Sequence, residues 1–268
     1  MKNIFKCAQI LTMKLCIHTI GKLSDGIALA NKEGFISGKM IDYVYNNKPS
    51  GKFFIGKLID KIYLQHPGWQ GIRSRKENLV EDINKAIKLS LEENKSIRIC
   101  DVASGPAKYI LEVLEQNKNI EISAEIRDLD SRWLIEAKEN AQRLRLNLDY
   151  KVANALKESD FIFDKKPNII VSSGFYDWFK DNELIKKSMK LIYDTLPKGG
   201  YFVFTNQSGH ADLTMVNAVF KDFNHNPLDM TVRSAEEINS WAKEIGFTIL
   251  ETKTDKYGYY SNTLAIKQ

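Results

Sequence analysis

The stretch IRICDVASGPAKYILEVLEQ, residues 97–116, decides the fold class of this chain. It opens with residues of strand character that lead into an acid, Asp101. Small residues follow at 103–105, and from Pro106 onward apolar residues recur at helical spacing. Proline suits the first helical position because its missing N–H would have no intrahelical partner there, so we predict a helix from Pro106. A strand, a tight turn and a helix in this order begin the ligand site of a doubly wound α/β sheet.

The turn discriminates between nucleotide cofactors. A dinucleotide-binding turn carries G-x-G-x-x-G, whereas the matching positions here are Ala103, Gly105 and Lys108. S-adenosyl-L-methionine (AdoMet) has no pyrophosphate, but it carries a carboxylate, an ammonium and a sulfonium. Backbone N–H groups at a helix start can bind the carboxylate, and an acid at the strand end can attract the ammonium. We therefore predict that Asp101, Ala103, Ser104 and Gly105 bind AdoMet; a turn that serves packing alone is the alternative.

A second acid supports the cofactor prediction. Residues 120–126 have a strand pattern that leads into Asp128-Leu129-Asp130. An acid about 20 residues past the glycine turn, on the next strand, is placed to bind the ribose hydroxyls. We assign this role to Asp128 and keep Asp130 as the alternative. An acid that merely favours a helix N-terminus is the other interpretation, and it suits Asp130 better.

The composition indicates a folded domain with an uneven charge. The 268 residues are enough for one large or two modest domains. Cys7, Cys16 and Cys100 have no metal-type spacing, so we expect no metal site, no disulfide framework and a cytoplasmic location. Residues 1–76 hold 13 Lys and Arg against 4 Asp and Glu, a net charge of +9, and the remainder has −4. This asymmetry favours a phosphorylated substrate, a membrane surface or a nucleic acid as partner, or reflects a solvated lysine-rich surface.

The first twenty residues mix lysines with apolar residues. The lysines interrupt the apolar residues too often for a transmembrane span. An amphipathic helix that packs on the body or lies on an anionic membrane is the alternative structure. Its apolar side is predicted to hold Ile4, Ala8, Leu11 and Leu15.

A basic cluster precedes the first strand. Short helices are expected over residues 24–64, and a long helix from about Ser74 to Glu93. Arg73 and Arg75 then fall at the start of the long helix, where its dipole disfavours cations. We predict that both arginines hold an anionic group of the substrate, with Trp69 closing the apolar side. Solvent exposure or an ordinary ion pair is the alternative.

From residue 97 strands and helices alternate, which predicts a largely parallel sheet. Two final strands are separated only by residues 255–258, too short for a helical crossover, so they are predicted to form an antiparallel hairpin. The predicted strands lie near 97–100, 120–126, 149–152, 167–173, 201–205, 247–253 and 259–266, and helices at 131–146, 181–196 and 234–245.

These stretches together resemble class I AdoMet-dependent methyltransferases. The resemblance is carried by residues 101–116, 126–130, 167–207 and 235–247. Within the class, the chain is similar to a poorly characterised methyltransferase family, some of whose members are fused behind an α/β-hydrolase-like domain. It implies an α/β fold: a Rossmann-like seven-stranded sheet of five parallel strands and a closing hairpin, with helices on both faces. We expect an N-terminal helical basic cap at 1–94 and the methyltransferase domain at 95–268.

The resemblance also implies site residues. Asn154 stands where many such enzymes have an acid facing the adenine amine, and its carbonyl can accept the same hydrogen bond. The fourth strand leads to Ser173, assigned to the cofactor, and to Tyr176 and Asp177, where acceptor contacts are usual. His210 and Asp177 could converge over the methyl group, one as general base for a hydroxyl acceptor, with Tyr176 beside them. The alternative is that the aromatic residues are core and His210 caps the next helix.

The predicted function is therefore methyl transfer from AdoMet to a small-molecule acceptor of anionic or lipid-like character, with peripheral contact to an anionic membrane as an option. Two alternatives stay open. Alanines in the turn suggest an AdoMet-binding or regulatory protein without transfer activity. The basic N-terminal region suggests an RNA-directed enzyme, but no aromatic-rich recognition motif supports nucleic-acid binding. The sequence carries no signal for oligomeric state.

Overall fold

The chain folds into two compact units. The computed structural model describes residues 2–93, 95–210, 212–222 and 224–268, with the backbone alone for residues 2–6. The first unit comprises Met1–Arg73 and His210–Met230, and the second comprises Ser74–Gly209 and Thr231–Gln268. The predicted boundary at residue 94 therefore differs from the division by packing, and the first unit is discontinuous in sequence.

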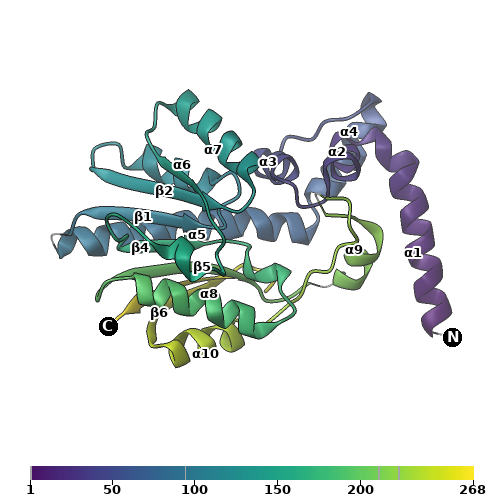
Figure 1. Ribbon diagram of the computed structural model, residues 1–268. Helices are drawn as coiled ribbons and strands as arrows, with labels where there is room; N and C mark the ends of the chain where they lie inside the picture. Colours follow the sequence, from purple (N-terminus) through teal and green to yellow (C-terminus); the bar gives the residue numbers. More distant parts are fainter. Residues whose placement is uncertain (1, 94, 211, 223) are drawn as a thin grey trace. The chain divides into compact units, whose positions relative to one another are not determined.

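The second unit is built on one seven-stranded sheet of order β3-β2-β1-β4-β5-β7-β6 (Figure 1). The pairs among β1 to β5 are parallel, and β7 runs antiparallel to both β5 and β6. The predicted Rossmann-like plan with a closing hairpin is confirmed. The strands are β1 Ile97–Val102, β2 Ile122–Asp128, β3 Asp149–Val152, β4 Ile169–Ser172, β5 Tyr201–Gln207, β6 Phe247–Thr254 and β7 Tyr260–Lys267.

Helices cover both faces of this sheet. Ile97 and Ile99 of β1 pack into a core with α5, α6 and α7, whereas Cys100 and Val102 pack into a core with α8 and α10. This alternation follows from the two-residue period of a strand. Figure 1 shows α6 and α7 on one side of the sheet and α8 and α10 on the other. The helices are α5 Pro67–Glu92, α6 Lys108–Gln116, α7 Ser131–Leu144, α8 Asn182–Thr195 and α10 Ala235–Ile245, with 3-10 turns η2 Glu158–Phe161 and η3 Tyr176–Trp178.

The order of strands creates a switch point for ligands. β1 pairs with β2 on one side and with β4 on the other, so Asp101 lies between Ile126 and Val171. The connections therefore leave β1 and β4 in opposite directions along the sheet. In open α/β sheets the crevice at the carboxyl ends of such strands receives the ligand.

The prediction of a helix starting at Pro106 was wrong. Helix α6 begins at Lys108, and its N-cap Ala107 has a left-handed backbone with φ 51°. A residue in that conformation is not part of an α-helix, so the turn extends through Ala107, one residue beyond Pro106. By contrast, α8 and α10 begin within one residue of their predicted starts at 181 and 234, because the side chains of Asp181 and Ser234 each accept an N–H from the first turn.

The predicted start of the long helix was also wrong. Helix α5 begins at Pro67, not at Ser74. Proline is preorganised for the first helical position, and the next N–H, of Gly68, donates to His66 Nδ1 at 3.1 Å. Arg73 and Arg75 therefore lie inside the helix, beyond its first turn. The dipole at the helix N-terminus does not disfavour cations at these positions. Leu79 and Ile83 of α5 pack into the sheet core, which is why most of this helix belongs to the second unit.

The first unit is organised around the buried carboxylate of Asp60. This side chain is 0% exposed. It accepts hydrogen bonds from Ser24 Oγ at 2.6 Å, Gly26 N at 2.8 Å, Tyr43 Oη at 2.5 Å and Ser50 N at 2.9 Å. One carboxylate thus joins three helices and the turn at Ser50. The helices of this unit are α1 Lys2–His18, α2 Asp25–Glu33, α3 Gly38–Asn46, α4 Phe53–Leu64 and α9 Leu213–Val219, with the 3-10 turn η1 Ile20–Leu23.

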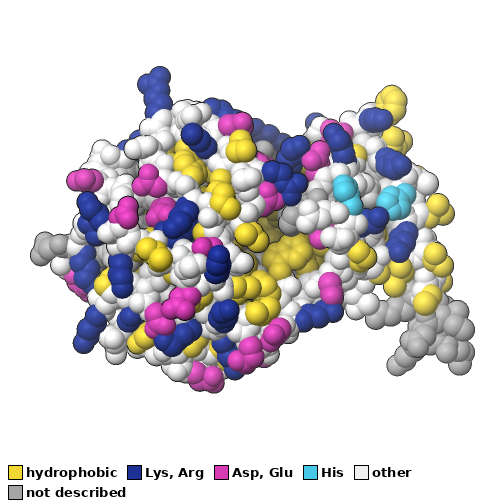
Figure 2. Space-filling model, in the orientation of Figure 1, with side chains coloured by type: hydrophobic (Ala, Val, Ile, Leu, Met, Phe, Trp, Pro, Cys, Tyr) yellow, Lys and Arg dark blue, Asp and Glu magenta, His cyan; other side chains and the backbone are white. Residues whose placement is uncertain are grey.

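Helix α1 turns a different side inward from the one predicted. Ile10 and Ile17 pack with Ile27 and Val219, whereas Ala8, Leu11 and Leu15 are exposed; Ile4 lies outside the described side chains. Residues seven apart, such as Ile10 and Ile17, share one helix side, and this narrower stripe is the one that meets α2 and α9. Figure 2 shows hydrophobic side chains beside Lys and Arg side chains on the surface of this unit. Among the helices that the structure describes, none is long and apolar enough to cross a membrane.

Candidate active site

The turn after β1 has an unusual backbone. Ala103, Gly105 and Ala107 all have positive φ, at 54°, 54° and 51°. Glycine adopts this conformation without a steric penalty, whereas alanine does not. A Cβ built on Gly105 would meet nothing within 4 Å, so open space lies on that side of the turn. The turn therefore offers a backbone cradle beside β1.

Asp101 ends β1 with half of its carboxylate unpaired. Its side chain is 0% exposed, and Oδ1 accepts a hydrogen bond from Tyr109 Oη at 3.0 Å. Oδ2 is buried and has no hydrogen-bond partner among the described residues. Burial raises the pKa of Asp101 well above its ordinary value, and nearby Asp128 adds to this, while Tyr109 opposes it. A buried carboxylate oxygen of this kind needs a partner from outside the described residues, and a water molecule or an ammonium group would satisfy it.

Asp128 lies beside the same turn. Its Oδ2 accepts the Gly105 N–H at 2.9 Å, and its Oδ1 accepts the Asp130 N–H at 2.8 Å. Burial raises the pKa of Asp128 above its ordinary value. Asp130 instead caps α7 by accepting the Arg132 N–H at 3.0 Å. Asp130 thus serves the helix N-terminus, as its alternative interpretation predicted, and Asp128 is the acid next to the glycine.

Two further predicted cofactor residues make local contacts. Asn154 Oδ1 accepts the Leu156 N–H at 2.9 Å, and the Asn154 N–H donates to Asp160 Oδ2 at 2.8 Å. The side-chain carbonyl therefore closes a turn after β3, although a carbonyl oxygen keeps a second lone pair. Ser104 is buried, and its N–H donates to the Arg127 carbonyl at 3.1 Å. This bond ties the turn to β2.

The loop after β4 is fastened to β5. Ser173 Oγ lies 3.3 Å from Thr205 Oγ1, and the Gly174 N–H donates to the same oxygen at 2.8 Å. Gly174 has φ 71°, and a Cβ there would lie 3.5 Å from Arg75 Nη2. The positive φ favours glycine here, and a Cβ would only come into ordinary van der Waals contact with the arginine.

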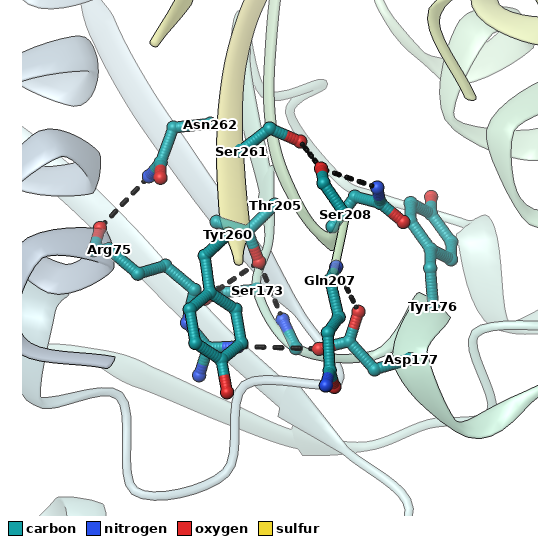
Figure 3. A network of polar contacts seen from close by, with 12 residues as sticks. Arg75, Ser173, Tyr176, Asp177, Thr205, Gln207, Ser208, Tyr260, Ser261 and Asn262 are labelled. Carbon is teal, nitrogen blue, oxygen red and sulfur yellow. Dashed lines mark hydrogen bonds and ion pairs between the residues drawn. The ribbon is translucent and has the colours of Figure 1, made fainter. Parts of the chain in front are cut away.

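Arg75 and Asp177 form a buried ion pair at the ends of β4 and β5 (Figure 3). Arg75 Nη1 lies 3.3 Å from Asp177 Oδ2, and the Arg75 guanidinium lies 4.9 Å from the centre of the Tyr260 ring. Asp177 Oδ1 accepts the Gln207 N–H at 2.8 Å. Burial raises the pKa of Asp177, while Arg75 and the Gln207 amide offset part of that effect. Sequence reasoning named both residues but did not predict their pairing.

Gln207 is a candidate that sequence reasoning missed. It is 1% exposed, and its Nε2 has no hydrogen-bond partner among the described residues. In Figure 3 its side chain and that of Tyr260 extend in the same direction, past the Arg75–Asp177 pair. The only sequence signal is its position at the end of the fifth strand, two residues after Thr205.

Tyr176 points away from Asp177 (Figure 3). It is 0% exposed and packs edge-on against Phe204, with ring centres 6.4 Å apart. Burial raises the pKa of its phenol, and the Ser188 and Ser172 hydroxyls oppose this effect. The structure therefore places Tyr176 in the core beneath the loop.

Arg233 holds this loop in place, and sequence reasoning did not find it. It is 5% exposed, and its guanidinium donates to the carbonyls of Tyr176, Phe179 and Lys180 and to Asn182 Oδ1. One buried cation thus binds three carbonyls within and just after the short η3 turn.

Three predicted site residues belong to the first unit. Trp69 is buried, with its ring centre 4.6 Å from that of Phe35. Arg73 donates to the Leu64 carbonyl at 3.0 Å and to the Val44 carbonyl at 3.4 Å, near the C-termini of α4 and α3. A cation at helix C-termini is favoured by their dipoles.

His210 is the third of these residues. Its Nδ1 accepts the Asp212 N–H at 3.1 Å, and burial together with the neighbouring His66 lowers its pKa. The N-cap of α9 is Asp212 and not His210, so the alternative in which His210 caps the next helix was wrong. Its convergence with Asp177 stays a prediction.

Comparison with known proteins decides the family. A family model described as "Putative methyltransferase" matches residues 4–267. The chain belongs to this methyltransferase family.

A curated relative of this chain is longer than the chain itself. It is 29% identical over 260 residues to the uncharacterized protein YnbC of Escherichia coli (strain K12). The match covers 96% of this chain but 44% of YnbC, so the chain spans less than half the length of that relative.

Solved structures share the methyltransferase fold. Magnesium protoporphyrin IX methyltransferase from Synechocystis PCC 6803, solved with bound SAH, superimposes with a TM-score of 0.58 at 11% identity, over 88% of this chain and 98% of that one. A possible exported protein from Bordetella parapertussis superimposes with a TM-score of 0.66 at 14% identity, over 87% and 79% of the two chains.

Proposed function

We propose that this protein transfers the methyl group of AdoMet to a small-molecule acceptor bound beyond the carboxyl ends of β4 and β5. The observation that carries the proposal is the buried, unpartnered Oδ2 of Asp101 beside the open side of Gly105. A buried carboxylate oxygen fits the ammonium of an amino-acid group, open space beside Gly105 leaves room for it, and the family membership agrees with this assignment.

The residues of the turn would hold the cofactor as follows. Asp101 Oδ2 would accept from the ammonium, and the open space beside Gly105 would leave room for the methionine part. Asp128 would accept from the ribose hydroxyls through the lone pairs that its two backbone bonds leave. Asn154 would hold the adenine through the remaining lone pair of its side-chain carbonyl. AdoMet supplies a methyl group on a sulfonium, which is already a good leaving group.

The acceptor would meet the Arg75–Asp177 pair. We assign Asp177 as the base that takes the proton of an acceptor hydroxyl, with Arg75 and the Gln207 N–H fixing its carboxylate. Gln207 Nε2 donates to an acceptor oxygen, which would satisfy that buried amide. Because the ion pair carries no net charge, the acceptor group at this point is a neutral hydroxyl, and any phosphate or lipid-like part lies farther out.

Calorimetry on the purified protein tests cofactor binding. AdoMet and its demethylated product should bind and NAD should not. Asp101→Asn should weaken AdoMet binding by about 1–3 kcal/mol, the scale for losing a charged partner of a buried group. Asp130→Asn is the matched control and should leave the affinity unchanged. Tight NAD binding without an AdoMet signal would refute the assignment.

A protein that binds AdoMet without transferring its methyl group is the second candidate. The left-handed Ala103 and Ala107 favour it, because alanine at these positions departs from the usual glycines. Incubation of cell extract with methyl-labelled AdoMet separates the candidates. Label in small molecules that depends on Asp177, absent with Asp177→Asn, supports transfer; AdoMet binding with no labelled product in any fraction supports the second candidate.

A further inference from the structure

Helix α4 carries a large apolar surface that the described structure leaves uncovered. Five apolar side chains on the first three turns of the helix form this surface, and we call them the α4 surface. In an ordinary surface helix the apolar stripe faces the core and is buried, whereas these five side chains are exposed. The members are Phe53 at 83%, Phe54 at 81%, Ile55 at 60%, Leu58 at 48% and Ile62 at 67% exposed.

The orientation of α4 turns three of these side chains, Phe54, Leu58 and Ile62, outward. At 3.6 residues per turn, Phe54, Leu58 and Ile62 share one side of the helix, and Asp60 and Leu64 occupy the opposite side. Asp60 and Leu64 are each 0% exposed. Because Asp60 is held by four hydrogen bonds, α4 cannot rotate to bury its apolar side without breaking them. The exposure is therefore built into the packing of the first unit.

The start of α4 adds a strained residue to this surface. Phe53 has φ 56°, and a bulky residue in the left-handed region is an outlier. A strained backbone conformation is retained only when the surrounding structure enforces it. Such residues are found most often at functional sites. The adjacent Phe54 is almost as exposed as Phe53, so the helix presents a pair of aromatic rings to its surroundings.

The exposed charged side chains of α4 and its N-cap have a single sign. Lys52, Lys57 and Lys61 are exposed, and the one acid of α4, Asp60, is buried. Figure 2 shows the same mixture of hydrophobic and basic side chains on this unit. An exposed apolar side with flanking lysines matches a lipid bilayer with anionic headgroups, where the rings enter the interface and the lysines bind headgroups.

We propose that the α4 surface docks this protein on an anionic membrane. The inference does not depend on methyl transfer, because none of its residues belongs to the candidate active site. Docking is peripheral: the side chains of one helix side enter the headgroup region, and the buried Asp60 side stays in the protein. Each lysine near such a surface contributes electrostatic attraction that salt screens.

Vesicle co-sedimentation tests the proposal. The probes are vesicles of phosphatidylcholine alone and vesicles with about 30% phosphatidylglycerol, each at low and high salt. The full chain should bind the anionic vesicles, and salt should weaken binding. Phe54→Ser with Ile62→Ser should reduce the affinity about tenfold or more, from lost apolar insertion. Lys57→Glu with Lys61→Glu should reduce it by a similar factor.

Matched controls come from helix α7 of the second unit. Ile135 is 58% exposed and Lys138 is exposed, so Ile135→Ser and Lys138→Glu should leave vesicle binding unchanged. Thermal unfolding verifies that every variant folds, which is expected because the replaced side chains make few contacts.

Three results would overturn the proposal. The first is no sedimentation with anionic vesicles, and the second is equal loss in the α4 and α7 variants. The third is a dimer in light scattering that the α4 variants dissociate while vesicle binding persists, since a second copy would then occupy the surface.

Discussion

At the scale of single residues, the turn after β1 stores strain that glycine would remove. Ala103 and Ala107 both have left-handed backbones. Ala107→Gly should therefore raise the free energy of unfolding by roughly 0.5–1 kcal/mol, because glycine has no Cβ penalty there. Ala137→Gly, at an equally buried position inside α7, is the control and should lower it by about 1 kcal/mol. Thermal unfolding measures both, and equal destabilisation would contradict the strain argument.

The buried carboxylate of Asp101 makes stability depend on pH. Its folded pKa is raised by burial, so the folded state favours the protonated form. Stability is therefore fully present below the ordinary pKa of about 3.9 and declines as pH rises through the folded value. Without ligand, Asp101→Asn should be more stable than the native protein near pH 7, and the difference should vanish near pH 3.

Ligand reverses that order. AdoMet should raise the melting temperature of the native protein at pH 7 by more than that of Asp101→Asn at the same concentration, because the ammonium pairs with the charged form and the variant binds more weakly. Equal stability of the two proteins without ligand at every pH would show that the Asp101 carboxylate is not the source of the penalty.

At the scale of elements, the first unit depends on one side chain more than on any helix propensity. Asp60 accepts four hydrogen bonds from α2, α3 and the turn at Ser50. Asp60→Ala should lower the free energy of unfolding by about 3–5 kcal/mol, since it leaves several buried donors without partners. Asp25→Ala is the control: Asp25 is exposed and bonded to Ser50 Oγ, so its loss should cost at most about 1 kcal/mol. Denaturant unfolding and limited proteolysis of residues 24–64 compare them.

Elements with local signals could be predicted from the sequence, and elements with distant determinants could not. The caps at Asp181 and Ser234 act within one helical turn, so their sequence patterns suffice. The start of α6 depends on the left-handed backbone of Ala107, for which an alanine gives no signal. The start of α5 depends on Pro67 as a first helical residue, although the same proline also suits a chain break.

The candidate site shows the same division. The spacing of strand, turn and strand predicts a shared position for Asp101, Gly105 and Asp128. The structure brings these three residues together at one turn. The Arg75–Asp177 pair joins residues 102 positions apart, and no local pattern encodes such a contact. Arg233 and Gln207 act through backbone groups and a buried amide, which depend on the folded sheet.

At the scale of the whole molecule, the first unit is assembled from two separated segments of chain. Ile17 and Ile27 from the first segment pack with Val219 from the second, and the second unit's sheet strands β1 to β5 lie between them in sequence. Sequence patterns alone placed a boundary at residue 94, because the return of residues 210–230 leaves no local trace. The family match over residues 4–267 includes both units.

This order has a consequence during synthesis on the ribosome. Residues 1–73 leave the exit tunnel long before Val219 exists, and at about 5–20 residues per second the delay is roughly 7–30 s. For that interval Ile17 and Ile27 lack a partner that completes their core. The nascent chain therefore exposes an incompletely buried, lysine-rich helical segment while the sheet is being synthesised. Chaperones that bind exposed apolar helices can bind this segment during that interval.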